Sequence, residues 1–192
     1  MVLLIGGPGC TGKTLLAQRV MERCAVPYVS LDHLKMGMIR GLPGCPFTAL
    51  DADGDIAAHL WPVAEAMAQV ALENGQHLIL EGCYIPCPAA ARLEREHPGL
   101  VRAVYLAFSR EYLERHWEDG VLRCRDAIER RLFPEERTVE EAIREHRETV
   151  EQCRRWRLTC REISGDYERA LSDIAAHCGA WILAARRRAP GG

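Results

Sequence analysis

The chain has 192 residues, with 25 Lys or Arg against 27 Asp or Glu, so its formal net charge at pH 7 is −2. A near-neutral chain of this kind lacks the overall basic character of many nucleic-acid-binding and membrane-surface proteins. No apolar run approaches the length of a transmembrane helix, and the chain begins without a basic leader. We therefore expect one cytoplasmic α/β domain with neither nucleic-acid nor membrane partners.

The nine cysteines are odd in number and scattered along a domain of ordinary size. That distribution is typical of reduced thiols rather than of a disulfide framework. Cys83 and Cys87 are the two closest in sequence, but no His or second cysteine pair lies at ligand spacing from them. Small buried side chains are therefore favoured over a zinc site.

A strand-length apolar run from Met1 to Ile5 leads directly into Gly6-Gly-Pro-Gly-Cys-Thr-Gly-Lys-Thr14. Residues 7–14 match the pattern G-x-x-x-x-G-K-[ST], and Leu16 and Val20 continue it at helical spacing. A glycine-rich loop of this pattern between a buried strand and an amphipathic helix is a P-loop, which binds a nucleoside triphosphate. The residues expected at the nucleotide are Gly7, Gly9, Cys10, Thr11, Gly12, Lys13, Thr14 and Leu15.

Each residue type in the loop has a physical role. Glycines allow positive φ, so consecutive amide N–H groups point inward at an anion, and the following helix adds its positive N-terminal end. Lys13 is expected to reach the β- and γ-phosphates of ATP, and the Thr14 hydroxyl to coordinate Mg²⁺. Cys10 has two interpretations: a small filler, or a thiol whose oxidation blocks nucleotide binding.

The remaining elements follow in order along the chain. Gly75 fits the residue just after a helix, and Thr138 with Glu141 makes a capping box. The expected strands are 26–30, 77–81, 100–108 and 159–164, and the expected helices are 34–40, 55–74, 88–97, 109–119, 139–153 and 167–182, with a turn-rich acidic loop over 41–54 and a frayed basic tail over 186–192.

Five short strands that alternate with helices predict a doubly wound parallel sheet with helices on both faces. Ligands of such sheets bind beyond the carboxyl ends of the strands. Asp32 follows the second strand and Glu81 ends the third, so both carboxylates are expected to face the phosphates held by the P-loop.

Phosphoryl transfer needs one carboxylate to accept or orient the acceptor's hydroxyl proton and another to hold Mg²⁺. We assign the first role to Asp32 and the second to Glu81, with the reverse assignment left open. The structural alternatives are that Asp32 caps the helix that follows it and that Glu81 is a solvated strand end.

Arginines crowd the stretch from Gly120 to Arg137, which is bounded by turn residues and suits a closing lid. Arg123 and Arg125 are the candidates to stabilise charge on the transferring phosphoryl group, and Arg130 and Arg131 are further candidates. The alternative is a helix surface of Glu–Arg pairs, which is favoured for Arg137.

The P-loop, Ser30-Leu-Asp-His33, Leu80-Glu-Gly-Cys-Tyr-Ile-Pro86 and the arginine-rich stretch together resemble the P-loop kinases of small molecules. Gly6-Gly-Pro-Gly9 is similar to adenylate kinase, and Glu81-Gly82 followed by Pro86 is more similar to 2-phosphoglycerate kinase. The resemblance implies one kinase domain over residues 1–185, a strand order 2-3-1-4-5, a lid at about 120–137, Mg²⁺ and ATP, and γ-phosphoryl transfer to a bound acceptor.

The acceptor does not follow from these motifs. No Gly-Phe-Pro-Arg-like run suits AMP, and no Arg closely follows Glu81 as it does in the zeta-toxin kinases. His33, Lys35, Arg40 and Tyr84 are the expected acceptor ligands, suited to an anionic or hydroxylated metabolite.

We expect the protein to be a monomer or a weak dimer. Two alternatives stay open: a nucleotide-dependent switch with weak hydrolysis, and a toxin or resistance kinase acting on a sugar nucleotide or an antibiotic.

Overall fold

A single parallel sheet organises the computed structural model, which describes residues 1–123 and 137–188. Its strand order, β2-β3-β1-β4-β5, confirms the order that the resemblance implied. Every pair of neighbouring strands is parallel. The strands are β1 (Val2–Gly6), β2 (Tyr28–Ser30), β3 (Leu78–Glu81), β4 (Val101–Phe108) and β5 (Thr159–Ile163).

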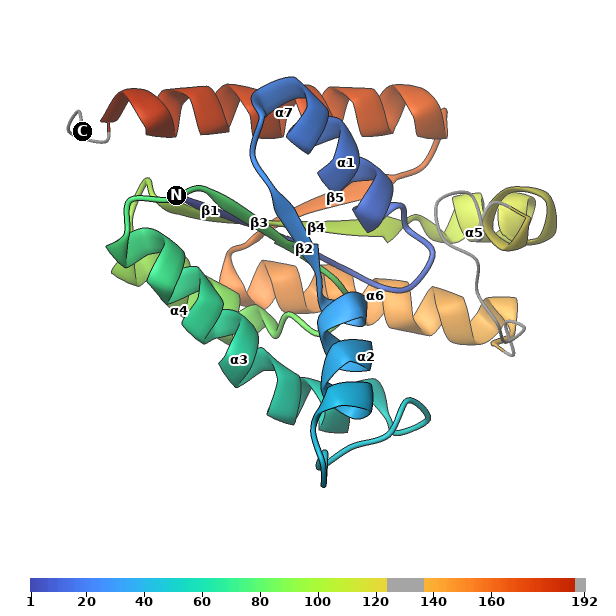
Figure 1. Cartoon of the computed structure of the whole chain (residues 1–192). Coiled ribbons are helices and arrows are strands. Elements are labelled where there is room, and N and C mark those ends of the chain that lie inside the picture. The colour runs from blue at the N-terminus through green and yellow to red at the C-terminus, as the bar shows by residue number, and fades with distance from the viewer. Residues whose placement is uncertain (124–136, 189–192) are drawn as a thin grey trace.

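Helices cover both faces of the sheet, as expected of a doubly wound fold. Figure 1 shows α1 and α7 on one face and α3, α4 and α6 on the other, with α5 beyond the end of β4. The helices are α1 (Lys13–Cys24), α2 (Leu31–Gly41), α3 (Asp53–Glu73), α4 (Cys87–Glu96), α5 (Arg110–His116), α6 (Val139–Trp156) and α7 (Tyr167–Arg188), and a short π-helix, η1 (Trp117–Leu122), follows α5.

The central strand β1 is apolar along its whole length because it is buried on both faces. Successive side chains of a strand point to opposite faces. Leu3 and Ile5 pack into the core under α1 and α7, while Val2 and Leu4 pack into the core over α3, α4 and α6. All four are fully buried, and each contributes about 2 kcal/mol to folding by leaving water. The strand thereby holds the loop that follows it at the centre of the sheet, at the carboxyl ends of the strands.

Several boundaries differ from the expected ones. Helix α2 begins at Leu31, directly after β2, because Leu31 is fully buried in the core; Asp32 therefore lies in the first helical turn. Helix α3 begins at Asp53, where Asp53 and Asp55 complement the positive end of the helix. Helix α7 continues to Arg188, so the expected tail is helical in its first residues. The Gly75 prediction is confirmed by its φ of 66°.

Helix α6 begins with the predicted capping box, in which Thr138 and Glu141 bond each other's backbone N–H groups. Further along, His146 is buried and its Nδ1 accepts a 2.8 Å hydrogen bond from the Phe108 N–H. Its ring also stacks on Phe108. An accepting Nδ1 requires the neutral tautomer with the proton on Nε2. Burial, together with Arg137 and Lys13, lowers the pKa of His146 to about 3.

His146 should make folding stability depend on pH in the mildly acidic range. The unfolded chain takes up this proton near its ordinary pKa of about 6.5, whereas the folded protein resists it until about pH 3. The stabilisation is therefore complete above pH 6.5 and is lost as the pH falls, at no more than about 1.4 kcal/mol per pH unit. Urea unfolding of the protein and of His146→Asn at several pH values should show a shallower dependence in the variant. The same change at exposed His177 should leave the slope unaltered.

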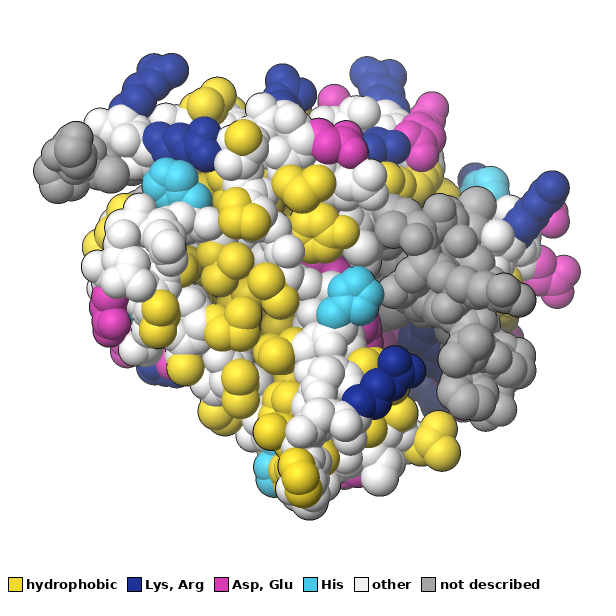
Figure 2. Space-filling view, in the orientation of Figure 1, with side chains coloured by type: hydrophobic (Ala, Val, Ile, Leu, Met, Phe, Trp, Pro, Cys, Tyr) yellow, Lys and Arg dark blue, Asp and Glu magenta, His cyan; other side chains and the backbone are white. Residues whose placement is uncertain are grey.

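In the part of the chain that the structure describes, no helix is both long and apolar enough to cross a membrane. Hydrophobic side chains nevertheless gather on the face that carries α2 and α3 (Figure 2). Exposed members of the described surface include Leu42 after α2 and Val63 and Val70 on α3.

Candidate functional site

The loop between β1 and α1 has the backbone shape of an anion cradle. Three of its residues have positive φ: Gly7 at 125°, Cys10 at 63° and Gly12 at 85°. Alternation of such residues with ordinary ones turns successive N–H groups toward one side of the loop. Helix α1 begins immediately afterwards, so its unsatisfied N–H groups meet the same point.

Glycine is required at two of these positions by contact as well as by φ. A Cβ on Gly7 would collide with the Leu106 carbonyl oxygen of β4, and one on Gly12 would collide with the Tyr167 hydroxyl at the start of α7. The loop is therefore held between the neighbouring strand and the last helix. Leu15 is half-buried against the core beneath it.

Lys13 and Thr11 both fold back on the loop. The Lys13 Nζ donates to the Pro8 carbonyl oxygen at 2.7 Å, and the Thr11 hydroxyl donates to the same oxygen at 3.0 Å. Burial opposes a charge on Lys13, but Cys83, Glu81 and Asp32 outweigh burial and raise the pKa of the ammonium. Lys13 is therefore a charged group kept inside the protein beside the cradle.

Thr14 and Glu81 bring two hard oxygen ligands together beside Lys13. The Thr14 hydroxyl donates to Glu81 Oε1 at 3.2 Å, joining the start of α1 to the end of β3. Glu81 is only 1% exposed, so it is not a solvated strand end. Burial raises the pKa of Glu81, against the opposing effects of Lys13 and hydrogen bonds from Ser30 and Thr14. This hydroxyl and carboxylate are the kind of donors that Mg²⁺ prefers.

Asp32 lies in a second polar group with Lys35 and Tyr84. The Lys35 Nζ is 3.1 Å from Asp32 Oδ1 and donates to the Tyr84 hydroxyl at 2.6 Å; the Tyr84 hydroxyl is 3.5 Å from the same Asp32 oxygen. Ser30, rather than Asp32, occupies the N-cap position of α2. His33 and Arg40 lie seven residues apart on another face of this helix and are exposed. The structure thus brings Lys35 and Tyr84 to Asp32 but leaves His33 and Arg40 on the surface.

One arginine of the predicted lid lies at the cradle. The Arg137 guanidinium approaches Gly9 so closely that a Cβ there would lie 2.9 Å from its nitrogen. Arg137 also forms an ion pair with Glu145 of α6. Arg123 ends η1 and is exposed. Arg125, Arg130 and Arg131, with most of the predicted lid, lie outside the described residues.

Comparison with solved structures finds similar folds over nearly the whole chain. A gluconokinase from Sinorhizobium meliloti 1021 matches with a TM-score of 0.53 and 17% identity, covering 95% of this chain and 90% of that one. A shikimate kinase from Bacteroides thetaiotaomicron matches at 0.53 and 18%, covering 92% and 97%. A tunicamycin resistance protein from Deinococcus radiodurans matches at 0.54 and 21%, covering 93% and 95%.

This chain has the α/β fold of these solved kinases. The structural similarity and the cradle at the end of β1 lead to the same conclusion, since small-molecule kinases are among these neighbours. No protein-family model matches the sequence, and no curated protein matches it either. The similarity in structure establishes the fold. The sequence identity to these neighbours is too low to identify the acceptor.

Three residues beside the cradle were not among the predicted site residues. Cys83 helps to raise the pKa of Lys13, and burial raises the pKa of the Cys83 thiol. Glu145 pairs with Arg137, and Tyr167 contacts Gly12. The one available signal was for Cys83, which lies two residues after Glu81. Nothing in the sequence around Glu145 and Tyr167 distinguishes them from other residues of a helix.

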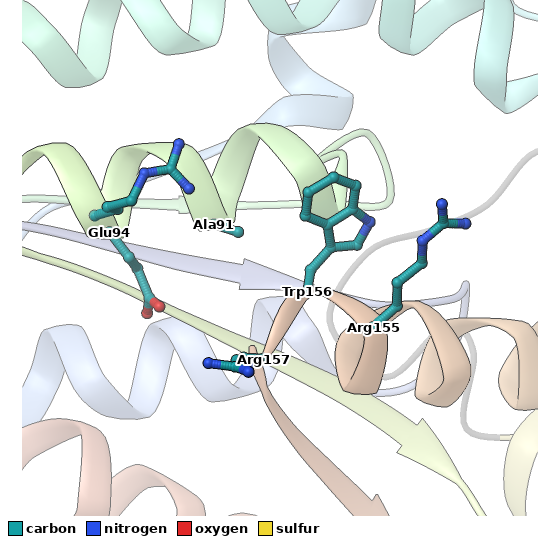
Figure 3. A pocket seen from close by; sticks show the side chains of 6 residues that line it. Ala91, Glu94, Arg155, Trp156 and Arg157 are labelled. Atoms are coloured by element: carbon teal, nitrogen blue, oxygen red, sulfur yellow. The ribbon is translucent and has the colours of Figure 1, made fainter.

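A separate hollow of about 490 Å³ lies between α4 and the end of α6. Both helix ends precede strands, so this hollow lies toward the amino ends of the strands, away from the cradle at their carboxyl ends. Glu94 on its wall accepts a hydrogen bond from the Ala103 N–H near the beginning of β4. Figure 3 shows Trp156 and Arg155 on α6 and Arg157 just after it. None of the residues that line this hollow is a predicted site residue.

Across residues 1–123 and 137–188, no three His, Cys, Asp or Glu side chains are grouped to hold a metal ion.

Proposed function

We propose that this protein is a kinase that uses ATP and Mg²⁺ to phosphorylate a hydroxyl group of a small molecule. The observation that carries the proposal is the joining of Lys13, Thr14 and Glu81 at the mouth of the P-loop, with Asp32 close enough to influence Lys13 and Glu81. Catalysis of phosphoryl transfer consists mainly of positioning and charge neutralisation, which is what such a group supplies.

The described residues fit the proposed ligands. The positive-φ loop and the start of α1 suit a triphosphate, and the Thr14 hydroxyl with the Glu81 carboxylate suits Mg²⁺. When bound, Mg²⁺ and ATP supply the transferable phosphoryl group and neutralise part of its charge. Lys13 would hold the phosphate oxygens in place of its bond with the Pro8 carbonyl, and Arg137 would add a cation on the side of Gly9.

Asp32 acts on the acceptor in this mechanism. Its carboxylate orients the acceptor hydroxyl and receives its proton as the oxygen attacks the phosphoryl group. Lys35 and Tyr84 hold the carboxylate in place through their contacts with Asp32. The assignment leaves Glu81 to the metal, because Glu81 contacts Thr14 and is too buried to meet an acceptor freely.

Acceptor-dependent release of ADP tests the proposal. The purified protein is incubated with Mg²⁺, ATP and a panel of alcohols, nucleosides and sugar derivatives, and ADP and phosphorylated product are measured together. We expect at least one acceptor to raise ADP release well above the rate with ATP alone. A nucleotide-dependent switch would instead hydrolyse ATP slowly at a rate that no small acceptor changes, and that result would contradict the proposal.

A further inference from the structure

A hollow of about 450 Å³ opens beside the cradle, between the first turns of α3 and the segment after β3. The two sites adjoin because Cys83 lines this hollow and also lies close enough to Lys13 to help raise the pKa of its ammonium. Tyr84, which contacts Asp32, is its next lining residue along the chain. A molecule in this hollow would therefore lie next to both Lys13 and the proposed base.

The walls of this hollow are mostly apolar. Trp61, Tyr84 and Ile85 contribute side chains that are themselves largely buried in the protein. Prolines and small residues complete the lining: Gly54, Ala57, Ala58, Pro62 and Pro86. Such walls favour an apolar body by the area removed from water. They offer few hydrogen-bonding groups for a polyhydroxylated sugar.

The charge at this hollow is negative. Asp53 at the start of α3 is the charged residue among its described lining residues. Asp53 lines the hollow close enough to Tyr84 that its charge, after burial and Asp32, helps to raise the pKa of the Tyr84 hydroxyl. Two of the nearby cations have acidic partners, since Lys35 is paired with Asp32 and Arg137 with Glu145. A third, Lys13, lies at the cradle and bonds the Pro8 carbonyl oxygen there.

We propose that the acceptor is a neutral or cationic alcohol with an apolar, ring-sized body that occupies this hollow, and that an amine on it faces Asp53. The inference rests on the proposed kinase function and narrows the anionic or hydroxylated metabolite expected from the sequence. A carboxylate or phosphate on the acceptor would meet Asp53, and none of the described lining residues is a cation that would offset it, which discriminates against such an acceptor.

The transfer balances without a further reactant. The acceptor O–H bond breaks and its proton passes to Asp32. A new bond forms between the acceptor oxygen and the γ-phosphorus, and the bond between that phosphorus and the β–γ bridging oxygen breaks. ADP leaves with this oxygen, and the apolar body stays against Trp61 and Ile85 during the step.

Three alcohols that share a phenyl ring and differ in charge test the inference by calorimetric binding without nucleotide. They are protonated 2-amino-1-phenylethanol, neutral 1-phenylethane-1,2-diol and anionic mandelate. We expect the amine to bind up to about fivefold more tightly than the diol, and mandelate up to about fivefold more weakly than the diol, since one exposed charge contact changes affinity by at most about that factor. In Asp53→Asn the amine should lose up to about fivefold in affinity and the diol should change little.

Asp55→Asn is the matched control, because Asp55 is exposed in the same first turn of α3 and does not line the hollow. The inference is overturned if mandelate binds as tightly as the amine, if none of the three binds, or if Asp53→Asn and Asp55→Asn act alike. ADP release with the same compounds keeps the two proposals apart. Binding in the expected order without phosphorylation counts against the kinase function, whereas phosphorylation that favours anionic acceptors counts against the acceptor class.

Discussion

Replacing Lys13 by alanine is expected to lower kcat for phosphoryl transfer by about 10³-fold, the loss typical of removing one preorganised charge from a transition state. Lys13 is the charged ammonium buried beside the cradle, and it donates its hydrogen bond to a backbone carbonyl of the same loop. Its charge is therefore available to the transferring phosphoryl group. Steady-state kinetics with an acceptor from the panel, at saturating Mg²⁺ and ATP, measures the loss.

The fold should survive this substitution, although Glu81 would lose the neighbouring cation that opposes the effect of burial on its pKa. Lys13→Met keeps most of the side-chain length and controls for packing. Both variants should unfold cooperatively and lose turnover to a similar extent. Turnover within tenfold of the unmodified protein in either variant would remove Lys13 from the mechanism and weaken the kinase proposal.

Asp32→Asn is expected to reduce kcat by about 10² to 10⁴-fold, the range for loss of a positioned general base. The amide keeps the shape of the carboxylate and can still accept a hydrogen bond from Lys35, but it cannot take a proton from the acceptor. The KM for ATP should change little, because Asp32 contacts Lys35 and Tyr84 rather than the loop. Full turnover in this variant would refute the assignment of Asp32 as the base.

Glu81→Gln provides the contrast that separates the two carboxylates. Because Glu81 contacts the Thr14 hydroxyl, its neutral replacement should raise the Mg²⁺ concentration needed for half-maximal rate. Asp32→Asn should leave that concentration unchanged. If the Mg²⁺ requirement instead shifts in Asp32→Asn and not in Glu81→Gln, the two roles are exchanged.

Similarity to small-molecule kinases leaves the acceptor open for a structural reason. The sheet positions the phosphate-binding parts, since the loop after β1 and the end of β3 meet at one edge whatever the acceptor is. The walls of the proposed acceptor hollow come from α3 and the segment after β3, which lie outside the strands that form that edge.

The sequence by itself determined the features that depend on neighbouring residues. The cradle follows from glycines and a lysine at fixed spacing, the capping box from Thr138 and Glu141, and the helix end from Gly75, because backbone conformation there is set within a few positions. Apolar runs at strand length and alternation with helices likewise predicted the parallel sheet. The carboxylates Asp32 and Glu81 were found because they follow strands.

Only the tertiary structure decided which distant side chains meet. Lys35 and Tyr84 are 49 residues apart, and Thr14 and Glu81 are 67 apart. Arg137 reaches Gly9, Cys83 reaches Lys13 and Tyr167 reaches Gly12, although no local pattern marks these pairs. Burial of Leu31 fixes which face of α2 is turned to the core, and it leaves His33 and Arg40, the other expected acceptor ligands, exposed on that helix. The physical reason is that burial and packing of whole elements set such contacts, whereas a sequence pattern records only what each residue requires of its near neighbours.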